Sequence, residues 1–221
     1  MNSATFAIDS SARRRDADIW FALPAGFLPL PFKEVLDARN VLEGADGGEH
    51  PLLQLVGELD ASERRQERGA LFAPVLRAFD VLACSGVLHC SMGLHLDDEG
   101  NGGVLPSLFT LSWRQIAWAP RNVIAARLAA GLHEALHVEV LELPCGPACL
   151  AVTRLSPPDV GVAGQLFQIA VHVPYPDATK LAVLTLATTA AHRVDDYRDL
   201  LRATARIVTF ESPLPVERGE V

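Results

Sequence analysis

Residues 133–137 read His-Glu-Ala-Leu-His and match the H-E-x-x-H pattern of zinc hydrolases. On a continuous helix, His133 and His137 lie one turn apart and bind zinc, while Glu134 activates a water molecule. A glycine precedes the motif, however, and residues 138–143 alternate like a strand, so the motif falls at a junction between two elements. We therefore predict no metal site here and keep a zinc-dependent hydrolase using these three side chains as the alternative interpretation.

The four cysteines are the other candidate metal ligands. Cys145 and Cys149 flank a Gly-Pro-Ala segment, and Cys84 and Cys90 lie where a predicted helix meets a predicted strand. Four thiolates could together bind one zinc ion, although each pair alone supplies only half a site. We interpret the cysteines as small buried or turn residues and predict no cofactor, with metal binding left open.

Three tryptophans are candidate partner-binding residues, because exposed aromatic side chains often mark protein interfaces. They are Trp20, Trp113 and Trp118. Packing in the core is the simpler interpretation of Trp113 and Trp118, so both roles stay open.

The elements that position these residues follow from the hydrophobic pattern. Residues 166–173 alternate between two faces, and residues 181–188 form an apolar run of the kind that is buried on both faces of a sheet. We predict that these two segments pair as antiparallel strands, with residues 181–188 at the centre of the sheet. The helix predicted over residues 194–205 covers them, and residues 207–210 are predicted to form a short strand.

The rest of the chain alternates between strands and helices. A short edge strand rich in proline is predicted near residues 20–31. The further predicted elements are helices over residues 32–39, 62–83 and 119–132, strands over residues 87–96 and 105–116, and a hairpin from strands over residues 136–143 and 150–155. Long antiparallel segments interrupted by helices indicate the α+β class. We predict one domain over residues 18–212, between flexible segments over residues 1–17 and 213–221.

The composition excludes some classes of function. The 221 residues carry a net charge of −8, which argues against binding to nucleic acid. No apolar leader is visible, and no apolar run is long enough to cross a bilayer, so we expect a cytoplasmic protein without a transmembrane segment.

The segments over residues 167–173, 181–188, 194–197 and 207–210 resemble the PsbP-like α/β/α sandwich superfamily. Residues 21–27, Phe-Ala-Leu-Pro-Ala-Gly-Phe, are similar to the LP-x-G-aromatic entry strand of its LpqN-like actinobacterial members. The resemblance implies an α/β/α sandwich with a central, mainly antiparallel sheet flanked by helices. It transfers no functional residue to this chain, and it implies a binding or accessory role.

We therefore expect a non-catalytic intracellular protein that binds a protein partner or a second copy of itself as a homodimer. The resemblance connects this role with an actinobacterial secretion or cell-envelope system.

Overall fold

The computed structural model describes residues 6–8, 17–30, 86–98, 104–155 and 165–212. In these ranges the strands are β1 (Phe6–Ile8), β2 (Ala22–Pro24), β3 (Phe27–Pro29), β4 (Val87–Leu96), β5 (Val104–Gln115), β6 (His137–Leu143), β7 (Gly146–Leu155), β8 (Leu166–Pro174) and β9 (Lys180–Thr188). The helices are α4 (Arg121–Gly131), the short 3-10 helix η2 (Ala191–Arg193) and α5 (Val194–Arg206). The helices predicted over residues 32–39 and 62–83 lie outside the described ranges.

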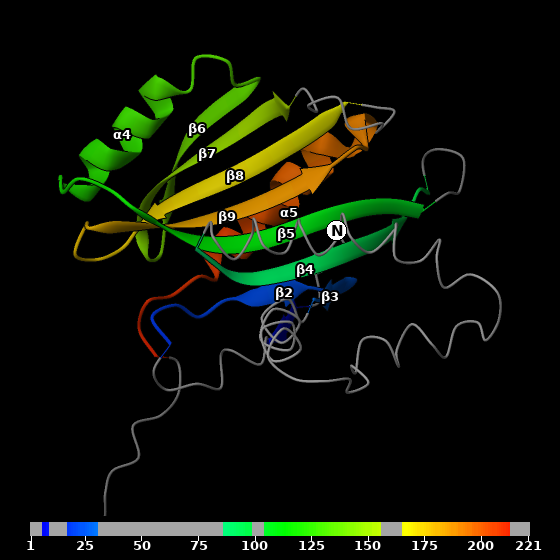
Figure 1. Ribbon diagram of the computed structural model, residues 1–221, viewed down its shortest axis with the longest axis horizontal. Helices are drawn as coiled ribbons and strands as arrows, with labels where there is room; N and C mark the ends of the chain where they lie inside the picture. The colour runs from blue at the N-terminus through cyan, green and yellow to red at the C-terminus, as the bar shows by residue number, and fades with distance from the viewer. Residues whose placement is uncertain (1–5, 9–16, 31–85, 99–103, 156–164, 213–221) are drawn as a thin grey trace, which may run out of the picture.

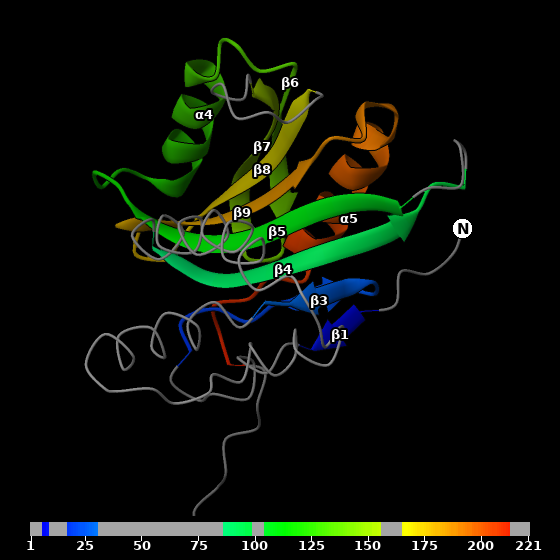
Figure 2. The same cartoon turned by 45° about the vertical axis from the view of Figure 1, so that its right-hand side comes forward.

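Seven strands form one antiparallel sheet in the order β3-β4-β5-β9-β8-β7-β6 (Figure 1). Figure 2 shows β3 and β6 at opposite ends of this sheet. The large antiparallel sheet confirms the coarse prediction, and strands dominate the described part of the chain. β1 lies within residues 1–17, which were predicted as a flexible arm, and it pairs with β2 in a separate two-stranded sheet.

β9 is the middle strand of the seven, and its apolar run is explained by burial on both faces. Leu184 and Leu186 belong to the main core together with residues of α5. Leu181 lies in a second cluster with Ile124 of α4, and Val183 packs against that cluster. β8 is antiparallel to β9 with Ile169 opposite Leu186, which confirms the predicted central pair.

Helix α5 covers the core face of β8 and β9. Tyr197, Leu201 and Ala205 recur at helical spacing and are buried, while two aspartates lie in the first turn, where they favour the positive end of the helix dipole. The strand predicted over residues 207–210 is wrong. Only an isolated bridge joins Thr209 to Trp20, because the chain turns away after one residue pair.

None of the described helices is long and apolar enough to cross a lipid bilayer.

Gly93 lies where three strands meet, opposite Phe27 of β3 and Ser107 of β5. A Cβ atom added at this residue would lie 2.7 Å from Nε2 of His95 and 2.9 Å from a ring carbon of Phe27, and it would also collide with the Ser107 hydroxyl. Gly93→Ala should therefore lower the free energy of unfolding by about 1–3 kcal/mol through overpacking, as measured by chemical denaturation.

The same substitution at Gly131 is the matched control. This glycine ends α4, and an added Cβ meets nothing within 4 Å. Gly131→Ala should leave stability unchanged or raise it by up to about 1 kcal/mol. Equal losses of stability in the two variants would show that close packing around Gly93 is not the reason why a larger side chain is unfavourable there.

Candidate functional site

The H-E-x-x-H segment does not form a continuous helix. Helix α4 ends at Gly131, His133 and Glu134 lie in the following turn, and His137 is the first residue of β6. The predicted junction is confirmed, and the two imidazoles come from different elements. His133 and Glu134 are exposed, and Nε2 of His137 lies 3.6 Å from a carboxylate oxygen of Glu139. Within the described ranges, no three His, Cys, Asp or Glu side chains are grouped closely enough to hold a metal ion.

The described cysteines behave as small apolar residues. Cys90 and Cys149 are buried, Cys145 is half-buried at the β6–β7 turn, and none of the three forms a disulfide. Burial raises the thiol pKa of all three, and that of Cys90 reaches about 11. These thiols are therefore protonated at neutral pH and are poor nucleophiles. Cys84 lies outside the described residues.

The three tryptophans are not gathered on one surface. Trp20 is only 6% exposed, so its ring belongs to the interior. Trp113 stacks on Phe210 at a centroid distance of 6.3 Å, and the Lys180 ammonium lies 4.1 Å from its ring centroid. Trp118 is 71% exposed. The structure therefore leaves Trp118 as the tryptophan of this set that a partner could reach directly.

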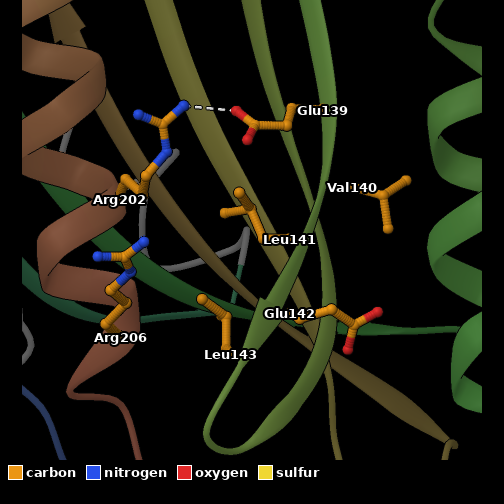
Figure 3. Close-up of a pocket in the computed structure, with 7 residues that line it drawn as sticks. All are labelled: Glu139, Val140, Leu141, Glu142, Leu143, Arg202 and Arg206. Carbon is orange, nitrogen blue, oxygen red and sulfur yellow. Dashed lines mark hydrogen bonds and ion pairs between the residues drawn. The ribbon is translucent and has the colours of Figure 1, made fainter.

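A groove of about 380 Å³ lies between β6 and the C-terminal half of α5 (Figure 3). In Figure 3, Glu139, Leu141 and Leu143 of β6 lie on the α5 side, whereas Val140 and Glu142 point to the α4 side. This follows from the alternation of side chains along a strand. The groove is lined by Glu139, Val140, Leu141, Glu142, Leu143, Arg202 and Arg206.

Among the described strands, the one that forms this groove is an edge of the sheet with no strand on its outer side. β6 is the last strand in the order, and it is seven residues long without a proline. The opposite edge strand, β3, has three residues and ends at Pro29. Short strands and prolines protect sheet edges from pairing with other chains. β6 lacks both devices, so it is the described edge best suited to pair with another strand.

The backbone groups that face this open edge can be identified. The carbonyl of Val152 accepts a hydrogen bond from the Leu136 N–H at 2.7 Å, so this carbonyl points from β7 toward the β6 side. Its register partner His137 therefore directs its backbone groups toward β7, as do the other odd-numbered residues of β6, because alternate residues point to alternate sides. The residues whose N–H and C=O point to the free edge are Val138, Val140 and Glu142.

Two arginines from α5 flank the edge and differ in their pairing. Arg202 donates hydrogen bonds to the carboxylates of Glu139 and Asp199. The hydrogen bond from Arg202 is the main reason why the pKa of Glu139 lies below its usual range, so this carboxylate is ionised at neutral pH. Arg206 is exposed, and its side chain forms no ion pair within the described part of the chain.

The arrangement offers hydrogen-bonding backbone and, within the described residues, one arginine without an ion pair, which suits recognition of an extended polypeptide. No model of a known protein family matches this sequence, and no curated protein is significantly similar to it.

The sequence pattern predicts β6 as a strand but does not predict the groove beside it. The available signal was Arg202 and Arg206, which are spaced four residues apart on one face of α5. Nothing local in the sequence indicates that these arginines lie beside residues 139–143.

Proposed function

We propose that this protein is a non-catalytic binding or accessory protein that engages a protein partner through the open edge of β6. The observation that carries the proposal is a seven-residue edge strand without proline, which lies beside an arginine-lined groove. A partner strand would hydrogen-bond to the open backbone groups of β6, and its side chains would enter the groove on the α5 side.

The resemblance to PsbP-like proteins supports the same class of role. α4 packs mainly on β7, and α5 packs on β8 and β9. In Figure 3 these helices lie on opposite sides of β6, which fits the proposed α/β/α sandwich. We extend the proposal to a cytoplasmic accessory protein of an actinobacterial secretion or cell-envelope system.

Val140→Pro tests this function in capture experiments with tagged protein and native cytosol. Proline removes the N–H that faces the free edge without removing a bond to β7, so the fold should tolerate it as edge strands do. We expect the variant to lose the partner that the wild-type protein captures. Val140→Ala is the matched control, because it shortens the side chain but keeps the N–H, and it should retain the partner.

Both variants should unfold cooperatively in thermal melts, as the wild-type protein does, which shows that they are folded. A partner that binds Val140→Pro as well as it binds Val140→Ala would overturn the assignment of the β6 edge.

The competing function is that of a zinc-dependent hydrolase that uses His133, Glu134 and His137. Elemental analysis of the purified protein separates the two. Stoichiometric zinc that disappears in His137→Ala, together with turnover of a substrate, would replace the binding proposal with an enzymatic one.

A further inference from the structure

We propose that a second copy of this chain occupies the β6 edge, paired antiparallel to the first about a two-fold axis at Val140. The inference rests on the proposed function in one respect, since both use the same edge. It goes further by naming the occupant and the register.

The backbone supports this register. Only residues whose N–H and C=O face the free edge can exchange hydrogen bonds with an added strand, and in β6 these are Val138, Val140 and Glu142. β6 runs from His137 to Leu143, so Val140 is its midpoint. A two-fold axis at Val140 places Val140 opposite Val140 of the second copy and Val138 opposite Glu142 of the second copy. All seven residues of each strand are then paired, which no other symmetric register achieves.

The side chains favour the same arrangement. The side chain of Val140 is 49% exposed, and in this register it packs against its own copy. A symmetric register centred on Glu139 would place two carboxylates directly opposite each other, which is unfavourable. A register centred on Leu141 would extend the pairing to Pro144, which has no N–H to donate.

The unpaired cation of the groove gains a partner in this dimer. In the Val140-centred register, Glu139 of the second copy lies opposite Leu141, and Leu141 lines the groove together with Arg206. Glu139 already accepts a hydrogen bond from Arg202 of its own chain, and its second oxygen can accept another. Each interface would then contain two symmetric sites in which an arginine of one copy approaches a carboxylate of the other.

Sedimentation velocity of the purified full chain over a range of concentrations tests the association. We expect a monomer–dimer equilibrium whose dissociation constant rises at least about tenfold in Val140→Pro. It should rise less in Val140→Ala, which loses the contact between the two Val140 side chains but keeps the N–H. Arg206→Glu should weaken the dimer as well, because it places like charges together, whereas Arg206→Lys keeps the charge and should weaken it less.

Disulfide cross-linking tests the register. Val140→Cys should form a disulfide-linked dimer under mild oxidation, because opposite residues of a hydrogen-bonded pair have Cα atoms about 5.5 Å apart, within reach of a disulfide. Glu142→Cys alone should not cross-link, because its two copies would lie four residues apart along the strand, about 13 Å. A mixture of Val138→Cys and Glu142→Cys should cross-link only as the mixed dimer. The wild-type protein controls for its own cysteines.

Several outcomes would overturn the proposal. A strictly monomeric mass at all concentrations excludes the second copy, and a dimer that persists in Val140→Pro uses another surface. Cross-linking of Glu142→Cys alone means that the register is wrong. If the wild-type protein is monomeric but Val140→Pro still abolishes capture of a cytosolic partner, self-pairing is excluded and the proposed function stands. If Val140→Pro weakens neither the dimer nor the capture of a partner, both proposals are excluded.

Discussion

Replacing Leu201 with alanine should lower the free energy of unfolding by about 2–5 kcal/mol, since a buried cavity adds to the lost transfer free energy. Leu201 is only 1% exposed and lies in the main core, where α5 covers β8 and β9. Leu201→Asp should cost more, because it buries a carboxylate without an opposite charge. Denaturant unfolding followed by circular dichroism measures both changes.

Arg198 on the same helix is the control. Its guanidinium forms ion pairs with Asp195 at 2.8 Å and Asp199 at 3.7 Å, and both aspartates are exposed. Pairs of this kind contribute little, so Arg198→Ala should cost less than about 1 kcal/mol. Equal losses at Leu201 and Arg198 would contradict the assignment of the buried face of α5.

Acidification should destabilise the protein through His172, by about 3 kcal/mol between pH 7 and pH 4. His172 lies in β8 between Cys149 of β7 and Val183 of β9, and its Nδ1 is buried without a hydrogen-bond partner. Burial, and secondarily the charge of Arg114, lowers its pKa from 6.5 to about 4. The unfolded chain therefore binds a proton as the pH falls below 6.5, whereas the folded chain does not until about pH 4, so acid favours unfolding.

His172→Gln removes this proton-binding group and should flatten the pH dependence by that amount. The measurement is the free energy of unfolding at pH 7 and pH 4 for both proteins. Other groups also respond to acid, among them Glu139 and Asp98, whose carboxyl pKa values lie below their usual range. They are common to both proteins, so the difference between the two pH profiles isolates His172. Parallel pH profiles of stability for the two proteins would show that folding does not lower the pKa of His172.

Several elements were predictable because their signals are local. Alternation over residues 166–173 and the apolar run over residues 181–188 predicted β8, β9 and their pairing, which a short turn enforces. The same period of two over residues 138–143 identified β6 and separated His137 from the helix that precedes it. The expected end of that helix near Gly131 was confirmed as well.

The assignment of Trp20 to an accessible surface could not be judged from its neighbours. An aromatic residue next to prolines and glycines suits both a surface loop and a core strand. The bridge to Thr209 at the other end of the chain and the packing of the adjacent Phe21 against Phe109 decide that Trp20 lies inside.

By itself, the sequence determined which segments are strands or helices and which side chains share a face, because the periods of 2 and 3.6 are properties of the local backbone. The order of the strands was decided by the tertiary structure alone. β5 pairs with β9 across about 70 residues of chain, and this pairing leaves β6 at one end of the sheet. The open edge, and the approach of Arg202 and Arg206 to it, follow from that long-range pairing. No local sequence pattern encodes the pairing of β5 with β9, since any strand with a suitable apolar face could pair with either of them.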